Sequence, residues 1–185
     1  MLGINEIKSG KNIILNGEPF LVLYHEQSKT GRAGSVLRTK LKNLKTGSVL
    51  EKTFQGAEQV DAADIVKSKA QFLYKENEDY CFMDNESYEQ FAINQEALDK
   101  LTDYLLEGTE VSVLSWNGNP INIELPVKMT FKITDAPPGV KGNTVSTGGK
   151  MATLETGLKI SVPLFVNVGD KIIVNTETGA YVSRA

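Results

Sequence analysis

The chain contains a single cysteine, a single histidine and a single tryptophan among its 185 residues. Because a disulfide needs two cysteines, the lone Cys81 excludes an internal disulfide, and zinc sites with the usual sets of Cys and His ligands are excluded as well. A catalytic triad would have to be built on His25. We therefore expect no metal site and no cofactor.

Long apolar runs are also lacking. No stretch approaches the roughly 20 apolar residues that span a bilayer, and the N-terminus, Met1-Leu2-Gly3, lacks the basic start and apolar core of a secretory signal. The hydrophobic content of 41% and the charged content of 23% are typical of a globular protein rather than of a disordered one. The sequence therefore predicts a cytoplasmic protein with no membrane partner.

Helix signals are scarce, and short β-type runs separated by Gly-containing turns predominate. One helix is predicted: Asn94 can cap it, Leu98, Leu101 and Leu105 form an apolar stripe, and Gly108 can end it. A second, short helical turn is suggested at residues 57–65. The expected fold class is all-β. The predicted strands are residues 12–15, 19–26, 35–43, 49–54, 70–75, 80–84, 110–116, 120–124, 128–134, 158–162, 171–174 and 180–182.

Breaks in composition predict three small domains, at residues 1–64, 65–127 and 128–185, each of a size that suits a closed β-barrel. The middle segment is acidic: from Glu76 to Glu110 there are eleven Asp/Glu and a single Lys or Arg, Lys100. This acidic surface could keep the segment away from nucleic acid or face a basic protein, and the simpler explanation is an ordinary solvated surface.

Positive charge is concentrated in one stretch. Between Ser28 and Lys45 there are six Lys/Arg and no Asp or Glu, whereas the remaining residues hold 14 Lys/Arg and 23 Asp/Glu, a net charge of −9. Arg32 is placed at the tip of a predicted hairpin that projects by roughly 25 Å at about 3.3 Å per residue. Its tip loop consists of Lys29, Thr30, Gly31, Ala33 and Gly34 around Arg32.

The returning strand carries Arg38, Lys40 and Lys42 at every second position. Since strand side chains alternate, these three cations share one face, and Leu37, Thr39 and Leu41 take the other. A cationic face that leads to a cationic tip suits binding along a phosphate backbone. The alternative is that the lysines protect an exposed strand edge against aggregation.

Other candidate residues have simpler explanations. His25 is expected to be a surface or hydrogen-bonded residue, and Cys81 a small core residue. Trp116 could stack on a base, although a role in filling the core is favoured. The carboxylate pairs Asp61 with Asp64 and Glu76 with Glu78 have no neighbouring nucleophile, glycine-rich loop or metal set, which argues against catalysis.

Several long motifs resemble those of bacterial elongation factor P. The C-terminal ones are Lys-Gly-Asn-Thr (141–144), Met-Ala-Thr-Leu-Glu-Thr-Gly (151–157), Val-Pro-Leu-Phe-Val-Asn-Val-Gly-Asp-Lys-Ile (162–172) and Thr-Gly-Ala-Tyr-Val-Ser-Arg (178–184). The N-terminal ones are Leu-Lys-Asn-Leu-Lys-Thr-Gly (41–47) and Glu-Lys-Thr-Phe (51–54). The resemblance covers essentially the whole chain.

This resemblance implies three barrels in an L-shape, an SH3-like barrel of the KOW type followed by two OB folds. It further implies a monomeric, non-enzymatic translation factor that binds the 70S ribosome between the P and E sites and contacts the peptidyl-tRNA. Such a factor stimulates peptide bond formation at consecutive prolines, where ribosomes stall. The tip would point toward the CCA end of the tRNA, with Arg38, Lys40 and Lys42 near the RNA backbone.

The residue at the tip indicates which branch of the family the chain resembles. Many members carry a modified lysine there, whereas a second branch carries an arginine to which a rhamnosyltransferase attaches rhamnose. The loop around Arg32 is more similar to the arginine branch, and it departs from that pattern at Thr30, Ala33 and Gly34. The sequence leaves both a rhamnosylated and an unmodified Arg32 open, and even a bare arginine, which stays charged at physiological pH, could bind a phosphate or stack on a base.

Two other function classes are compatible with the residues. A free oligonucleotide-binding protein would use the two C-terminal barrels and would bind isolated single strands in a salt-sensitive way, which the acidic middle segment opposes. An enzyme would have to depend on His25.

Overall fold

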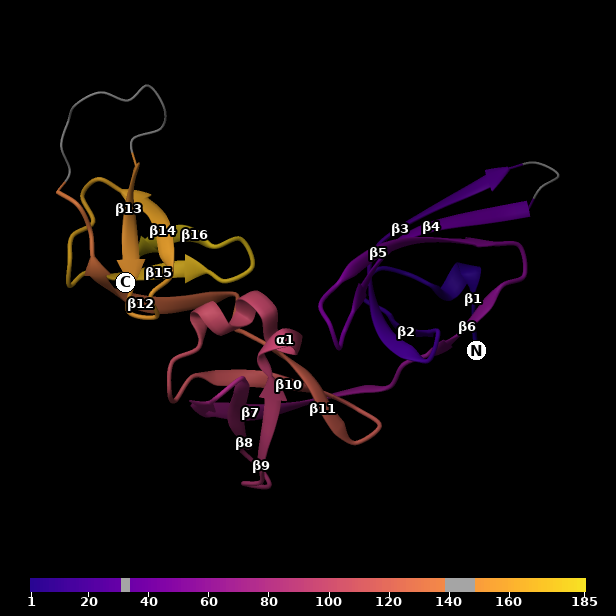
Figure 1. Cartoon of the computed structure of the whole chain (residues 1–185). Helices are drawn as coiled ribbons and strands as arrows, with labels where there is room; N and C mark the ends of the chain where they lie inside the picture. Colours follow the sequence, from indigo (N-terminus) through magenta and orange to yellow (C-terminus); the bar gives the residue numbers. More distant parts are fainter. Residues whose placement is uncertain (31–33, 139–148) are drawn as a thin grey trace. The chain divides into compact units, whose positions relative to one another are not determined.

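The computed structural model describes residues 1–30, 34–138 and 149–185, and most of them lie in β-strands. The strands form three antiparallel sheets that follow one another along the chain (Figure 1). In the described ranges, no helix has the length and apolar character needed to cross a bilayer. The all-β prediction is confirmed.

The first sheet has six strands in the order β1-β6-β2-β3-β4-β5. Its strands are β1 (Leu2–Gly3), β2 (Asn12–Leu15), β3 (Glu18–Thr30), β4 (Gly34–Asn43), β5 (Val49–Gln55) and β6 (Gln59–Ala62), with a 3₁₀ turn at Ile4–Glu6. The core of this sheet includes Ile7, Ile13, Val22, Leu37, Leu41 and Phe54, all at most 1% exposed.

The helical turn predicted at residues 57–65 is wrong. Gln59–Ala62 is a strand, β6, which pairs with β1 through Val60 and Leu2 and with β2 through Ala62 and Ile13. Pairing with two neighbours satisfies the backbone groups of this short segment, and this tertiary context outweighs a weak local helix preference.

The second sheet has the order β11-β10-β7-β8-β9. Its strands are β7 (Ile65–Glu76), β8 (Asp79–Asp84), β9 (Gln90–Asn94), β10 (Glu110–Trp116) and β11 (Asn119–Glu124). Aromatic residues fill its core: the rings of Phe72 and Phe82 lie 5.5 Å apart, and those of Phe82 and Phe91 stack at 5.7 Å.

The third sheet has the order β14-β13-β12-β15-β16. Its strands are β12 (Lys128–Asp135), β13 (Gly149–Leu154), β14 (Lys159–Pro163), β15 (Lys171–Asn175) and β16 (Ala180–Arg184). When the five strands of each of these two sheets are numbered 1 to 5 in chain order, both sheets have the strand order 3-2-1-4-5, the second sheet being read from β9 to β11. In both, the third strand also contacts the fifth, so that each five-stranded sheet curls back on itself as an OB-fold barrel does.

The prediction of a single long helix from Asn94 to Gly108 is correct at its start and wrong in its length. Asn94 caps a helix as expected, since its Oδ1 accepts a hydrogen bond from the Glu96 amide at 3.0 Å. However, α1 spans only Gln95–Leu98, and a 3₁₀ helix, Asp99–Tyr104, follows it. The change of direction occurs at Asp99, which has a φ of 47°.

The packing of this segment explains the break. The chain folds into two compact units, residues 1–99 with 110–124 and residues 100–109 with 125–185. Leu98, 1% exposed, packs in the first unit beside β9 and β11, whereas Tyr104 belongs to the core of the second unit, 6.0 Å from Phe131 between ring centres. One straight helix cannot present its apolar stripe to two separate cores.

Candidate nucleic-acid interface

The feature that the sequence singled out, the basic hairpin, consists of β3 and β4. Their pairing runs without interruption from Tyr24 opposite Lys40 to Thr30 opposite Gly34, after a bulge at Leu23. A bulge increases the local twist and redirects the strand that follows it. Figure 1 shows the two strands extending past β1, β2 and β6.

The returning strand β4 alternates as predicted. Arg38, Lys40 and Lys42 are exposed, whereas Leu37, Thr39 and Leu41 are buried. Thr39 has no unpaired hydroxyl in this setting, because its Oγ1 donates to the Lys52 carbonyl at 2.8 Å. The buried face anchors the strand in the barrel and thereby fixes the direction of the three cations.

Pairing brings acidic residues to this face that the sequence stretch itself does not contain. Glu26 of β3 lies opposite Arg38, and Glu51 of β5 lies opposite Lys40, with Lys40 Nζ 3.9 Å from Glu51 Oε1. Both groups of that pair are exposed, at 51% and 82%, so the pair holds Lys40 only weakly. The face is cationic on balance, and its positive charge is lower than the sequence suggested.

Tyr24 is a candidate binding residue that the sequence analysis did not single out. It is 55% exposed and lies opposite Lys40 on the cationic face. An exposed aromatic ring between cations can stack on a base while the cations bind phosphates. The signal was present in the alternation of β3, where Tyr24 falls on the same face as Glu26.

The hairpin is supported on both sides. Strand β5 pairs with β4 as far as Val36. On the other side, His25 Nδ1 accepts hydrogen bonds from the Ser9 amide at 3.1 Å and from the Ser9 hydroxyl at 2.9 Å. An isolated two-stranded hairpin is marginal in water, so such support gives the projecting element a defined direction.

A second side chain reinforces this support. The Gln27 Nε2 group donates to Asn5 Oδ1 at 2.7 Å and to Ser35 Oγ at 2.6 Å. It therefore links the N-terminal segment, β3 and β4. The prediction that His25 is a surface or hydrogen-bonded residue is confirmed.

The predicted tip residues Gly31, Arg32 and Ala33 lie outside the described residues. Of the other predicted tip residues, Lys29 pairs with Ser35 and Thr30 pairs with Gly34 through the backbone. The pairing thus continues to the last described residues on either side of Arg32.

The remaining candidates from the sequence do not form a reactive site. Cys81 is half-buried rather than a core residue, and its thiol hydrogen-bonds Tyr74, which raises the pKa of that tyrosine. Trp116 is half-buried, with Lys45 Nζ 5.1 Å from its ring centre, so it neither fills the core nor presents an open face on that side. Among the described residues, no group of three or more His, Cys, Asp or Glu could hold a metal ion.

The acidic middle segment contains a pocket without catalytic groups beyond its carboxylates. The pocket is lined by Glu78, Asn94, Gln95, Glu96 and Asp99. These five side chains include no cysteine, serine, lysine or histidine that could act as a nucleophile with a paired base. Of the predicted pair Glu76 with Glu78, only Glu78 lines this pocket, beside the carboxylates of Glu96 and Asp99.

Comparison with sequence profiles divides the chain into three matched regions. The KOW-like domain of elongation factor P matches residues 3–60, its OB domain matches residues 65–123, and the C-terminal domain of elongation factor P matches residues 129–184. Together these regions cover nearly the whole chain.

Curated relatives match over the same length. Elongation factor P of Dictyoglomus thermophilum is 46% identical over 185 residues, and that of Thermotoga maritima is 45% identical over 185 residues, in both cases with 100% of each chain covered. Among solved structures, translation initiation factor 5A from Methanococcus jannaschii is similar with a TM-score of 0.56 and 20% identity, covering 67% of this chain and 91% of that one. This last likeness concerns the fold.

A family protein of the same initiation factor from Naegleria fowleri has a TM-score of 0.50 and 14% identity, covering 66% of this chain and 94% of its own. The sequence relatives, which are named as a translation factor and match from end to end, decide the assignment. This chain belongs to the elongation factor P family.

Proposed function

We propose that this translation factor binds the 70S ribosome between the P and E sites, contacts the peptidyl-tRNA and stimulates peptide bond formation at consecutive prolines. The observation that carries this proposal is the supported β3–β4 hairpin, with Arg38, Lys40 and Lys42 exposed on one face beside Tyr24. Exposed cations at alternate positions suit successive contacts with an RNA backbone.

The factor acts by positioning rather than by acid-base chemistry. Proline is a slow, geometrically constrained amine donor, and holding two reactants in a productive pose lowers the barrier through prepaid orientation. His25, the one imidazole of the chain, has its Nδ1 engaged by Ser9 at the base of the hairpin. This engagement makes His25 a structural residue and supports a factor that is not an enzyme.

Arg32 is the proposed functional tip, directed toward the CCA end of the tRNA. It is also a candidate for rhamnosylation by an arginine rhamnosyltransferase that would recognise the loop formed by Lys29, Thr30, Gly31, Ala33 and Gly34. A guanidinium, with or without the sugar, remains cationic and offers planar donors to phosphate and a flat face to a base.

The experiment that tests the tip is Arg32→Ala in cells that lack any other copy of the factor. We expect translation of a reporter through a run of prolines to fall to the level of a deletion strain, while a reporter without prolines is unaffected. The control is Lys159→Ala, which removes an exposed cation from β14 in the third sheet. Full activity of Arg32→Ala would show that the tip is not the functional group.

The parent protein, purified from its native cells, decides between the modified and the unmodified tip. An intact mass of the native protein that exceeds the mass of the chain by one deoxyhexose, mapped to the peptide containing Arg32, would establish rhamnosylation. An unaltered mass together with normal proline-run translation would show that the bare guanidinium is sufficient.

A further inference from the structure

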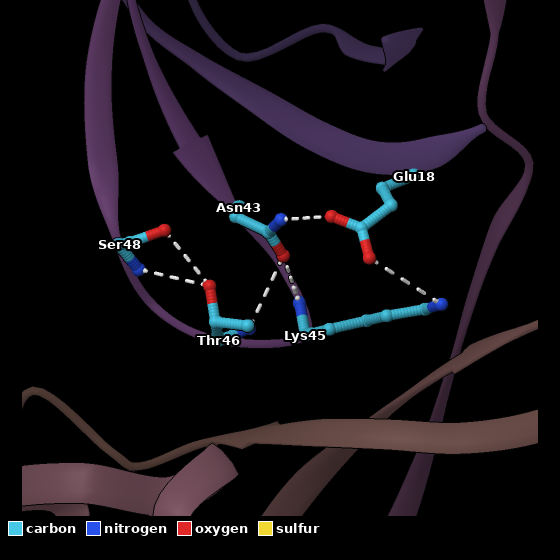
Figure 2. Close-up of polar contacts among 5 residues, drawn as sticks. All are labelled: Glu18, Asn43, Lys45, Thr46 and Ser48. Atoms are coloured by element: carbon cyan, nitrogen blue, oxygen red, sulfur yellow. Dashed lines mark hydrogen bonds and ion pairs between the residues drawn. The ribbon is translucent and has the colours of Figure 1, made fainter. Parts of the chain in front are cut away.

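The loop that joins β4 to β5 is held in one conformation by Asn43. This side chain is 4% exposed, and its Oδ1 accepts hydrogen bonds from the amides of Lys45 at 2.8 Å and Thr46 at 3.1 Å. Its Nδ2 donates to Glu18 Oε2 at 2.7 Å (Figure 2). Gly47 completes the turn with a φ of 73°, a conformation that favours glycine.

This loop contacts the second sheet within the same compact unit. The Leu44 carbonyl accepts a hydrogen bond from Asn122 Nδ2 at 3.2 Å, and Lys45 Nζ lies 5.1 Å from the ring centre of Trp116. Lys45 Nζ is also 4.0 Å from Glu18 Oε1, which orients the ammonium group (Figure 2). A cation over an indole ring is the most favourable of such pairs.

Asn122 has every polar atom of its side chain in use. It is 6% exposed, and its Nδ2 donates both to the Leu44 carbonyl and to the Ala97 carbonyl of α1, the second at 3.0 Å. Its Oδ1 accepts from the Ile123 amide at 2.7 Å. Burying an amide is favourable only when its hydrogen bonds are made, so losing the Leu44 partner would leave a buried donor unsatisfied.

We propose that Asn122, assisted by the Lys45–Trp116 contact, fastens the hairpin-bearing first sheet to the second sheet, so that the two move as one body. Asn122 is then a positioning residue for the tip. This inference rests on the proposed function, because the fastening matters only if the hairpin has to deliver a group to a fixed place.

Such a fastening is needed because the hairpin acts as a lever. The part of β3 beyond its bulge is roughly 20 Å long at about 3.3 Å per residue. A rotation of roughly 10° at its base would displace its far end by about 3 Å, more than the ~1 Å misplacement that already slows a positioned reaction. Supports at the base of the hairpin cannot prevent this displacement if the whole first sheet pivots on the second.

The test uses the full chain and the substitution Asn122→Asp. The carboxylate has the shape of the amide and keeps an acceptor for Ile123, but it replaces the donor by an oxygen that faces two carbonyls. The matched control is Asn119→Asp on the same strand, whose Nδ2 donates only within its own hairpin, to the Asn117 carbonyl at 3.3 Å.

The first readout is ¹⁵N relaxation, which gives rotational correlation times for residues 1–64 and for the part of the second sheet in the same compact unit, residues 65–99 with 110–124. In the parent and in Asn119→Asp we expect one common tumbling behaviour for both segments. In Asn122→Asp the two segments should tumble differently while each keeps its dispersed spectrum. A common tumbling behaviour in Asn122→Asp would overturn the inference.

The second readout is translation through a run of prolines, which should fall several-fold in Asn122→Asp. Uncoupled sheets with full translation would overturn the positioning role, and the test of Arg32 would remain independent of that result. If the second sheet loses its fold in Asn122→Asp, Lys45→Met takes its place. That change keeps an apolar stem over Trp116 and removes the cation. We therefore expect a smaller difference between the correlation times of the two sheets, and equal correlation times would overturn the inference.

Discussion

At the scale of single residues, Asp170 shows how the C-terminal part of the chain is closed. Arg184 Nη2 of β16 donates to Asp170 Oδ1 at 2.7 Å, and the Asn167 amide donates to Asp170 Oδ2 at 2.8 Å. The hydrogen bond from Arg184, and then that from Asn167, hold the pKa of Asp170 below its ordinary value of 3.8. The same pair raises the pKa of Arg184. The last strand is thereby tied to the loop between β14 and β15.

The lowered pKa of Asp170 predicts an acid-dependent stability. In the pH range below 3.8 and above the lowered pKa, the unfolded chain binds more protons at this site than the folded chain, so stability falls as the pH falls through that range. Asp170→Asn should therefore be less stable than the parent at neutral pH, and the gap should narrow as the pH drops below 3.8. Urea unfolding at a series of pH values, monitored by far-ultraviolet circular dichroism, measures this difference in the free energy of unfolding.

Glu177→Gln is the control for this prediction, since it makes the same kind of change at an exposed turn residue between β15 and β16. Its effect on the free energy of unfolding should be small at all pH values. An Asp170→Asn variant whose loss of stability is the same at neutral and at acid pH would contradict the assigned cause.

Residues whose roles depend on neighbours in the sequence were predictable, and residues that join distant segments were not. The alternation of Arg38, Lys40 and Lys42 and the cap at Asn94 follow from local spacing. The hydrogen bond from Asn122 to Leu44 crosses 78 positions, and no local pattern announces it. For the same reason the cation over Trp116 could not be read from the sequence.

At the scale of elements, the break between α1 and the following 3₁₀ helix depends on one unusual backbone conformation. Asp99 has a φ of 47° and a ψ of −126°. A residue with a Cβ atom is disfavoured there, and glycine is not. This local strain is accepted because the turn allows Leu98 and Tyr104 to enter different cores.

The comparison of Asp99→Gly with Asp99→Ala isolates this backbone effect, because both variants lack the aspartate side chain. In an ordinary helix the alanine variant would be the more stable by about 1 kcal/mol. At this position we expect the reverse order, with Asp99→Gly more stable than Asp99→Ala by ~1 kcal/mol. Thermal unfolding of the two variants checks the sign, and a more stable Asp99→Ala would show that the positive φ is not adopted.

Strand β13 shows why some elements escaped the sequence analysis. In Gly149–Leu154 the inward positions are Lys150, Ala152 and Leu154, so a lysine stands where the pattern of a buried strand calls for an apolar residue. Lys150 is 9% exposed, and its Nζ donates to the Pro137 carbonyl at 2.9 Å. This hydrogen bond gives the ammonium group a partner, and only the fold reveals that partner. Strand β9 was missed because only Ile93 of its residues is buried.

At the scale of the whole molecule, charge varies from segment to segment more than the sequence analysis recognised. Residues 1–64 hold 9 Lys/Arg and 7 Asp/Glu, a net charge of +2. Residues 65–127 hold 4 and 12, a net charge of −8, and residues 128–185 hold 7 and 4, a net charge of +3. The negative charge of the chain therefore resides in the middle segment, and a polyanion would attract both of the other segments.

The division into two compact units leads to a prediction about unfolding. The only tryptophan of the chain, Trp116, belongs to the first unit, so its fluorescence reports on that unit. Phe131 is fully buried in the core of the second unit, where it packs on Tyr104, whose pKa is raised by burial. Phe131→Ala should cost the second unit about 3–5 kcal/mol. In urea unfolding, circular dichroism should then show a phase at a lower urea concentration than in the parent. The midpoint measured by Trp116 fluorescence should be the same as in the parent.

The converse variant is Phe82→Ala, which removes a fully buried ring from the second sheet, in the same unit as Trp116. It should lower the fluorescence midpoint and leave the phase of the second unit in place. Coincident transitions by both probes in Phe131→Ala would mean that the chain unfolds as one cooperative body. The two units are joined where the chain passes between them, at residues 99–100, 109–110 and 124–125. Separate transitions would show that these three connections transmit little of the stability of one unit to the other, as expected if each unit keeps its own hydrophobic interior.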